Sequence, residues 1–302
     1  MISPKTIEQA LGEMQTLRDC LRWSVSTFLR AGLHFGHGTD NAWDEARWLV
    51  LSAVALPFDS PEWVFDARIA TPERERLAQL LKRRVVERVP VAYLLGEAHF
   101  AGLRFDVDQN VLVPRSPIGE LIEAGFEPWL GGNEPSRILD LCCGSGCIGI
   151  AAGMRFDGVR VDLADISPAA LAVARRNVTR HGVGATTRVL ESDLFAGLEG
   201  ERYDLILCNP PYVDAAEMAA LPEEFRHEPR LGLAAGEDGL DLVRRILREA
   251  RAHLSEEGML VLEVGASAAA LEAAYPRLPL VWPEFERGGL GVALIRAADL
   301  PQ

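Results

Sequence analysis

The hydrophobic residues of this chain change their spacing near residue 95. Up to that point they recur every three or four positions, which places them on one face of a helix. A first stripe is followed by a second after Asp40 or Asn41 as the cap, and a third helix is expected from Thr71 through Arg88. The pattern therefore predicts a small helical domain over residues 1–95. The stripe residues are Ile7, Leu11, Met14, Leu17, Leu21 and Val25, then Trp43, Ala46, Leu49, Val50 and Ala53.

Two short runs of alternating hydrophobic and polar residues come next, Glu97–Phe105 and Val107–Pro114. Such alternation is typical of β-strands with one buried face. A turn at Asp106–Asn110 would join them, so residues 96–116 are predicted to form a β-hairpin linker.

Short aliphatic runs then alternate with helical patterns, as in parallel sheets built from βαβ units. Strands are expected near residues 137, 159, 186, 203 and 258, with a final pair near 279 and 291. Residues 117–302 are therefore predicted to form an α/β domain with a Rossmann-like seven-stranded sheet. The segment 213–240 is too long for a plain connection, so it is expected to enclose a substrate, the alternative being a surface insertion.

Small and acidic residues stand where the predicted strands end. The strand near 137 leads through Asp140 into a glycine-containing loop that opens a helix, and such a loop lets a ligand contact the backbone. The second strand ends in Asp165, whose carboxylate can accept both hydroxyls of a ribose. The third is followed by Asp193, which could accept from an adenine amino group. The loop residues are Cys142, Cys143, Gly144, Ser145 and Gly146.

The fourth strand ends in the tetrapeptide Asn209-Pro210-Pro211-Tyr212. A planar NH2 group offers two N–H donors and a poorly available lone pair. The Asn209 side-chain oxygen can accept one hydrogen and the Pro210 carbonyl the other, while Tyr212 lies over the planar group. This would orient and localise the lone pair without acid–base catalysis. Alone, the tetrapeptide also fits a proline-rich turn, but four strand ends in order favour a functional site.

Composition and charge narrow the classes of partner. Hydrophobic residues make up 48% of the chain, enough for a substantial core. The sequence has neither a membrane-length apolar run nor a signal pattern, so a cytoplasmic protein without membrane contact is expected. Residues 1–95 hold 12 basic and 12 acidic side chains, so the remainder, with 19 and 32, carries the whole net charge of −13. That part should repel a nucleic-acid backbone and attract a basic protein.

The five cysteines are odd in number, and four lie in or beside predicted sheet elements, which favours reduced thiols over disulfides. Cys143 and Cys147 have a metal-like spacing but no second Cys or His pair, so no metal site is predicted.

Several segments resemble the protein N5-glutamine S-adenosylmethionine methyltransferases. The resemblance implies a class I methyltransferase domain, S-adenosyl-L-methionine as methyl donor, a helical domain that recognises substrate, and transfer to the side-chain amide nitrogen of a protein glutamine. It implies catalytic roles for Asn209, Pro210 and Tyr212, with Asp140 anchoring the cofactor loop. The matching segments are Arg88–Glu97, Val111–Arg115, Asn209–Tyr212, Glu228–Leu231 and Ala235–Leu240. The implied cofactor-binding residues are Asp140, Cys142, Cys143, Gly144, Ser145, Gly146, Asp165, Ile166, Asp193, Leu194 and Asn209.

Two branches of that family act on peptide-chain release factors and on the third protein of the large ribosomal subunit. The release-factor branch typically continues its Pro-Arg into Pro-Glu-Thr-Glu, whereas this chain reads Pro114-Arg115-Ser116-Pro117 and resembles the ribosomal-protein branch. Asp40–Trp48 points the same way. Cys142 stands where the release-factor branch commonly has Gly, so the backbone freedom of that position is expected to be lost. A basic ribosomal protein is thus the expected partner, with release factors as the alternative.

Two other functions fit parts of the pattern. The same tetrapeptide serves amino methyltransferases of nucleic-acid bases, which the acidic charge and the missing basic, aromatic-rich domain disfavour. A ribosome-assembly factor that binds the cofactor without turnover would not need Asn209. For the leading function no general base is expected, so the rate should be flat across neutral pH. An apparent pKa of about 6 to 7 would instead indicate His227.

Overall fold

The computed structural model describes residues 3–301, which form two compact units. One comprises the chain up to Glu97 together with Pro222–His227, and the other comprises Ala98–Leu221 and the chain from Glu228 onward. The hydrophobic pattern gave no sign that Pro222–His227 belongs to the helical unit.

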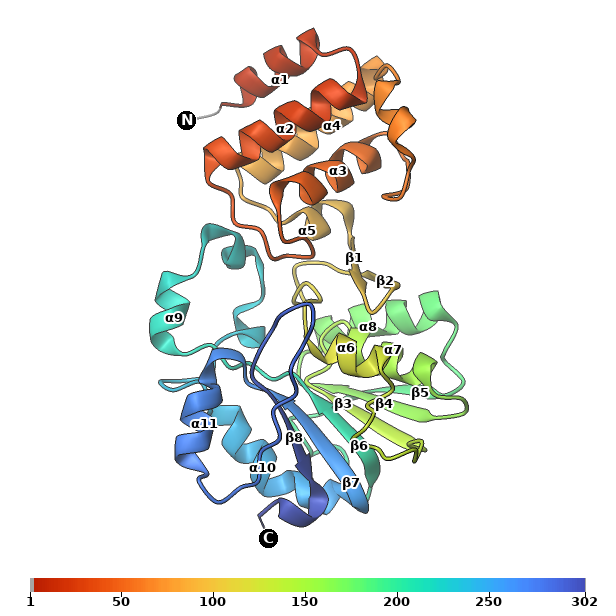
Figure 1. The fold of residues 1–302 in the computed structure, drawn as a ribbon, viewed down its shortest axis with the longest axis vertical. Helices are drawn as coiled ribbons and strands as arrows, with labels where there is room; N and C mark the ends of the chain where they lie inside the picture. Colours follow the sequence, from red (N-terminus) through yellow and green to blue (C-terminus); the bar gives the residue numbers. More distant parts are fainter. Residues whose placement is uncertain (1–2, 302) are drawn as a thin grey trace. The chain divides into compact units, whose positions relative to one another are not determined.

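The helical unit is built from amphipathic helices whose apolar faces meet: α2 packs on α3, and both α1 and α3 pack on α4 (Figure 1). Asn41 is the cap of α3, because its side-chain oxygen accepts the N–H groups of Trp43 and Asp44. The helices are α1 (Pro4–Glu13), α2 (Leu17–Ala31), α3 (Ala42–Ala53), η1 (Glu62–Asp66), α4 (Thr71–Val85), α5 (Val91–Leu95) and η2 (Glu223–His227).

Two helix boundaries differ from the prediction. The first stripe is divided, because Thr16 and Asp19 form a capping box that starts α2. The helix α4 ends at Val85 rather than Arg88, since Arg88 adopts a left-handed φ of 60° that an α-helix cannot contain.

A buried cluster of charges joins Pro222–His227 to the helices of this unit. The Arg84 guanidinium lies between Glu45 (2.6 Å) and Glu224 (3.1 Å), and donates to the His34 carbonyl at 2.7 Å. Glu224 also accepts the His34 N–H at 3.0 Å. The charges of this cluster are therefore paired and hydrogen-bonded, as burial requires.

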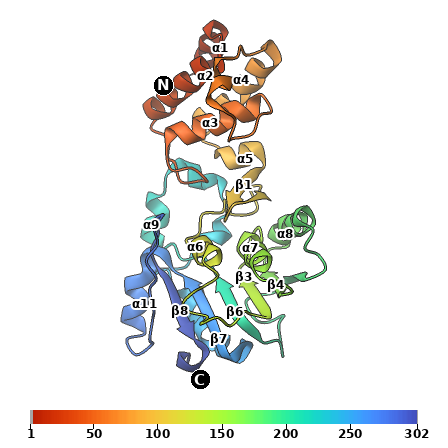
Figure 2. The same cartoon turned by 45° about the vertical axis from the view of Figure 1, so that its right-hand side comes forward.

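The second unit contains a six-stranded sheet in the order β5-β4-β3-β6-β7-β8, parallel except for β8 (Figures 1 and 2). The α/β fold and the first five strand positions are confirmed. The strands are β3 (Arg137–Leu141), β4 (Arg160–Asp165), β5 (Thr187–Glu191), β6 (Tyr203–Cys208), β7 (Leu254–Glu263) and β8 (Val292–Arg296). The helices are α6 (Ile118–Glu123), α7 (Cys147–Arg155), α8 (Pro168–His181), α9 (Ala215–Ala220), η3 (Arg230–Gly232), α10 (Asp241–His253), η4 (Gly265–Ser267), α11 (Ala268–Ala274) and η5 (Ala297–Asp299).

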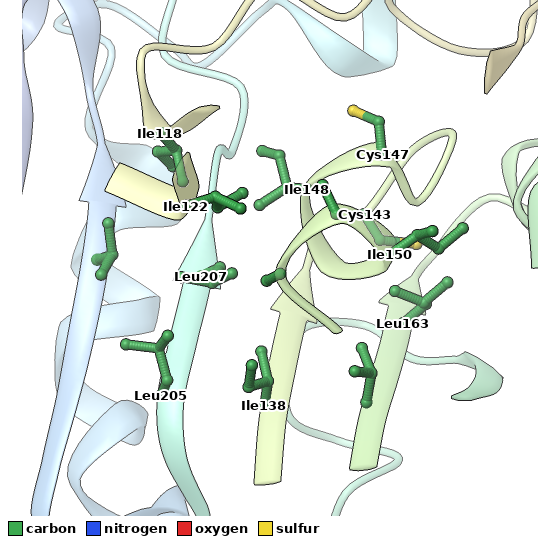
Figure 3. Packing of buried hydrophobic residues seen from close by; sticks show 14 of the residues in the cluster. Ile118, Ile122, Ile138, Cys143, Cys147, Ile148, Ile150, Leu163, Leu205 and Leu207 are labelled. Carbon is green, nitrogen blue, oxygen red and sulfur yellow. The ribbon is translucent and has the colours of Figure 1, made fainter. Parts of the chain in front are cut away.

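Alternate residues of the central strands face opposite sides of the sheet, and each side is covered by helices. Ile138, Leu205 and Leu207 belong to the core under α6 and α7, which Figure 3 shows from close by. Leu139 and Ile206 belong to the core shared with α10 and α11. Because the sheet is buried on both faces, ligands can reach it only at its edges or at the ends of its strands.

The prediction of seven strands is wrong. The expected strand near residue 279 is reduced to a single bridge between Val281 and Leu294. Pro276, Pro279 and Pro283 surround that bridge, and prolines lack the N–H that would extend a ladder.

The predicted hairpin is also wrong in its register. The strands are β1 (Glu97–Phe100) and β2 (Leu103–Asp106), joined by a two-residue turn in which both central residues have positive φ, Ala101 (46°) and Gly102 (73°). No strand forms over Val107–Pro114 within the described chain, and the Val113 N–H donates to the Glu228 carboxylate at 3.0 Å instead of to a neighbouring strand.

None of the helices in residues 3–301 combines the length and the apolar character needed to cross a bilayer.

Candidate active site

The carboxyl ends of β3, β4 and β6 lie side by side at the point where the strand order reverses. Leu141 of β3 pairs with Ala164 of β4 on one side and with Cys208 of β6 on the other. The next residues, Cys142, Asp165 and Asn209, therefore stand at neighbouring strand ends. This is the position at which open α/β sheets bind their ligands.

The loop after β3 is held by hydrogen bonds from its own backbone. The Cys143 N–H donates to the Ala164 carbonyl (3.0 Å), and the Gly146 N–H donates to the Cys143 carbonyl (2.8 Å). The Ser145 carbonyl accepts from the side chain of Asn177 at 2.9 Å. No heavy atom of the described chain lies within 4 Å of the place where a Cβ on Gly144 would be. The loop is thus ordered, and its backbone is open at Gly144.

Asp165 links the ends of β4 and β3. Its carboxylate accepts the N–H groups of Gly144 (2.9 Å) and Ser167 (2.8 Å). Burial raises the pKa of this carboxyl, although these hydrogen bonds act in the opposite direction. The neighbouring Ile166 is half exposed, an apolar surface beside an acidic group.

Asp140 points into the protein. It is 1% exposed and accepts the Gly149 N–H at 2.8 Å in the first turn of α7. Burial raises its pKa to about 7. Asp140 thus connects β3 to α7 and fixes both ends of the intervening loop.

Asp193 and Leu194 follow β5. The Asp193 carboxylate forms an ion pair with Arg245 of α10 at 3.1 Å and is half exposed. Leu194 is buried with a left-handed φ of 52°, and its carbonyl accepts the Ser192 hydroxyl at 2.5 Å. Arg245, which was not among the predicted site residues, shares the Asp193 carboxylate.

Asn209 is partly exposed, whereas Pro210 and Pro211 are buried. Within residues 3–301, no hydrogen bond of the fold engages the Asn209 carboxamide. The Tyr212 hydroxyl donates to Glu263 of β7 at 3.1 Å. The polar end of Asn209 is therefore free to meet a ligand at the strand end.

Cys142 lies on left-handed backbone although it lacks the freedom of a glycine, since its φ is 61°. The loop keeps the conformation that a glycine would allow and accepts the strain of a side chain there.

Comparison with known proteins agrees with this geometry. Two curated relatives, both named ribosomal protein uL3 glutamine methyltransferase, come from Xanthomonas campestris pv. campestris and Xylella fastidiosa. The first is 52% identical over 96% of this chain and 94% of its own length, and the second is 51% identical over 96% and 93%. This chain belongs to the ribosomal protein uL3 glutamine methyltransferase family. The resemblance to protein N5-glutamine methyltransferases, including the branch, is confirmed.

A wider similarity covers the domain that holds the site. The profile of the Methyltransferase small domain matches residues 129–273. Among solved structures, the catalytic domain of hMettl16 in complex with an RNA hairpin superimposes with a TM-score of 0.51 at 19% identity, covering 76% of this chain and 82% of that one. At this identity the likeness concerns the fold alone.

Four polar residues that were given no site role in the prediction form hydrogen bonds here, and three of them, Arg115, Ser116 and Glu228, lie in segments that carry the family resemblance. Glu263 accepts hydroxyls from Tyr212 and from Ser116, the latter at 2.5 Å. Arg115 binds Glu228 through both guanidinium nitrogens, at 2.5 and 2.6 Å. Glu263 was open to prediction, since it is an acidic residue ending a hydrophobic strand, as Asp165 is.

No group of three or more His, Cys, Asp or Glu side chains in the described part of the chain could hold a metal ion. Burial raises the pKa of the thiols of Cys143, Cys147 and Cys208.

Proposed function

We propose that this protein methylates the side-chain amide nitrogen of a glutamine in ribosomal protein uL3 of the large subunit, with S-adenosyl-L-methionine as the methyl donor. The observation that carries the proposal is identity above 50% over nearly the whole chain to enzymes named for that reaction. The tetrapeptide at the end of β6 supports it, because its groups match the donors of a carboxamide.

The residues at the strand ends fit the donor. S-adenosyl-L-methionine supplies an electrophilic methyl group on a positively charged sulfur. In our proposal Asp165 accepts the ribose hydroxyls, while Ile166 and Leu194 contact the adenine and Asp193 accepts from its amino group. The Cys142–Gly146 loop approaches the donor through its backbone, as the open position at Gly144 allows. Asp140 holds this loop through Gly149.

The tetrapeptide then orients the substrate amide. The Asn209 oxygen accepts one amide hydrogen and the Pro210 carbonyl accepts the other, while Tyr212 covers the planar group. Pinning both hydrogens directs the nitrogen toward the methyl group and favours the charge that develops on nitrogen during transfer. The amide proton leaves to water afterwards, so no side chain must act as a base.

Charge and exposure support the choice of partner. The acidic charge lies in the part of the chain beyond residue 95, and would attract a basic ribosomal protein rather than a nucleic-acid backbone. In the helical unit Trp43 and Trp63 are 56% and 73% exposed, and large exposed aromatic side chains are typical of protein-binding surfaces. We assign substrate recognition to this unit, substrate enclosure to segment 213–240, and the cytoplasm as the place of action.

Mass spectrometry of cells that lack this protein tests the proposal. The uL3 glutamine should lose its methyl group, and the purified protein with labelled S-adenosylmethionine should restore it. Retention of the uL3 methyl group together with loss of one from a release factor would overturn the choice of substrate. Transfer of label to RNA would overturn the reaction class.

A further inference from the structure

Glu263 is the last residue of β7 and lies beside the tetrapeptide. The preceding Leu262 pairs with Cys208, the residue before Asn209, and Glu263 itself pairs with Val292 of β8. It is 4% exposed. One carboxyl oxygen accepts the Ser116 hydroxyl at 2.5 Å, and the other accepts the Tyr212 hydroxyl at 3.1 Å.

Three residues hold Tyr212 in place. Within the described chain, Glu263 is the only one of them that contacts the Tyr212 hydroxyl. A Cβ on Gly265 would lie 2.5 Å from the ring, so the backbone there packs directly against it. Ser267 donates its hydroxyl to the Tyr212 carbonyl at 3.1 Å. The ring plane is therefore set by the backbone on one side and by Glu263 at its polar end.

A carboxyl group is an unfavourable choice for a purely structural contact here. Burial raises the pKa of Glu263 to about 7, against the opposing effects of Ser116, Tyr212 and Arg115. Cys208 of β6 is a further titratable neighbour, and Glu217 lies near Tyr212. The paired residue on β8, Val292, is apolar. A neutral amide would fill the same space with a smaller free-energy penalty for burial. Stability alone therefore does not account for a carboxyl group at this position.

We propose that Glu263 is a positioning residue for methyl transfer, which fixes the Tyr212 hydroxyl together with Ser116 and thereby holds the ring over the substrate amide. This inference rests on the proposed function. The ionised carboxylate accepts both hydroxyl hydrogens, whereas the protonated form must donate its own proton to one of the two oxygens and disturbs that contact. The turnover number kcat should therefore rise with pH and level off above about 7. This replaces the earlier expectation of a flat profile.

His227 offers the competing explanation for such a profile. It belongs to the helical unit, where its Nε2 contacts the Glu87 carbonyl at 2.8 Å. The variant Glu263→Gln separates the two, because it keeps the size of the side chain and removes its titration. Its kcat at pH 8 should be about tenfold lower, with a flat pH profile and S-adenosylmethionine affinity within about twofold. A His227→Gln variant should keep the wild-type profile.

The matched control is Asp204→Asn. Asp204 lies at the opposite end of β6 and also accepts two serine hydroxyls, from Ser136 (2.8 Å) and Ser255 (2.9 Å). Its variant should leave kcat and the pH profile unchanged. Tyr212→Phe should lose about as much kcat as Glu263→Gln, and the double variant should lose no more than either one. Losses that multiply in the double variant, or an unchanged kcat in Glu263→Gln, would overturn the inference.

A readout without activity uses tyrosine labelled with 13C at ring Cζ. The Tyr212 resonance, identified by its absence in Tyr212→Phe, should titrate near pH 7 in the wild type and in Ser116→Ala, but not in Glu263→Gln. Failure to titrate in the wild type would overturn the contact between ionised Glu263 and Tyr212. A wild-type protein that titrates but never methylates uL3 would instead overturn the proposed function.

Discussion

Asn209 and Asp165 stand at the ends of the two strands that flank β3, and replacing each should have a different effect. Asn209→Ala removes the acceptor for a buried amide hydrogen, which costs about 1–3 kcal/mol in addition to lost orientation. The value of kcat should fall by at least about 100-fold, with S-adenosylmethionine affinity within a few-fold. Asp165→Ala should instead weaken that affinity by about 10- to 100-fold. Isothermal titration and methyl-transfer assays measure both, and equal loss of donor binding in Asn209→Ala would contradict its role.

Cys142 carries a side chain on left-handed backbone, and this strain is measurable. Cys142→Val keeps an apolar side chain of similar size but is β-branched, so it should lower the free energy of unfolding by about 1–2 kcal/mol. Cys142→Gly relieves the strain and should remain within about 1 kcal/mol of the wild type, because lost packing offsets the gain. Urea titrations of the two variants give the comparison, and a valine variant as stable as the wild type would show that no strain is present.

At the residue scale, the sequence predicts which residues lie at the strand ends but not which side chains they contact. The positions of Asp165 and Asn209 could be predicted because each residue ends a hydrophobic run, and the carboxyl ends of parallel strands lie at one edge of the sheet. The ion pair of Asp193 with Arg245 joins β5 to α10, and no local spacing encodes a contact over that separation.

At the scale of elements, hydrophobic periodicity could not predict that Pro222–His227 belongs to the helical unit. This segment is short, polar and far in sequence from the helices it joins, and its position depends on the buried ion pair between Glu224 and Arg84. The missing strand near 279 was a different kind of error, since Pro276 and Pro279 were visible in the sequence and contradict a regular ladder.

The pair Glu223 and Glu224 tests what holds that segment. Glu224→Ala leaves the buried Arg84 with one carboxylate fewer and should lower the free energy of unfolding by about 3–5 kcal/mol. Glu223 is exposed, and its contact to Arg88 is 3.7 Å long, so Glu223→Ala should change stability by less than about 0.5 kcal/mol. Urea unfolding of the Glu223→Ala and Glu224→Ala variants measures the two changes in stability. Equal effects would mean that the buried pair does not fix the segment.

At the scale of the whole molecule, buried acids make the stability depend on pH. Asp140 and Glu263 have pKa values of about 7 in the fold, above the ordinary values of 3.8 and 4.5. At pH values between the ordinary pKa and the folded-state pKa, the folded protein keeps protons on these two carboxyls that the unfolded chain has released. The contribution of the two carboxyls to the free energy of unfolding is therefore complete at low pH and is lost as the pH rises through 7. Burial also raises the pKa of Asp165 and Glu45, which act in the same direction. Burial lowers the pKa of His181, so this histidine makes the protein more stable as the pH rises. One such group opposes the fall in stability caused by the carboxyls but does not reverse it.

The free energy of unfolding should therefore fall between pH 5 and pH 8 by on the order of 5 kcal/mol, roughly 2.5 kcal/mol for each of Asp140 and Glu263. Carboxyls whose pKa is lowered, such as Asp204 and Glu201, are ionised in both states above pH 5 and contribute nothing to this slope. Asp140→Asn and Glu263→Gln should each flatten the profile and raise stability at pH 8, since neither amide titrates. Circular dichroism during urea unfolding at the two pH values provides the measurement. Stability that stays level or rises toward pH 8 would contradict the raised pKa values of these two carboxyls in the fold, and Glu263→Gln would then bring no gain in stability at pH 8.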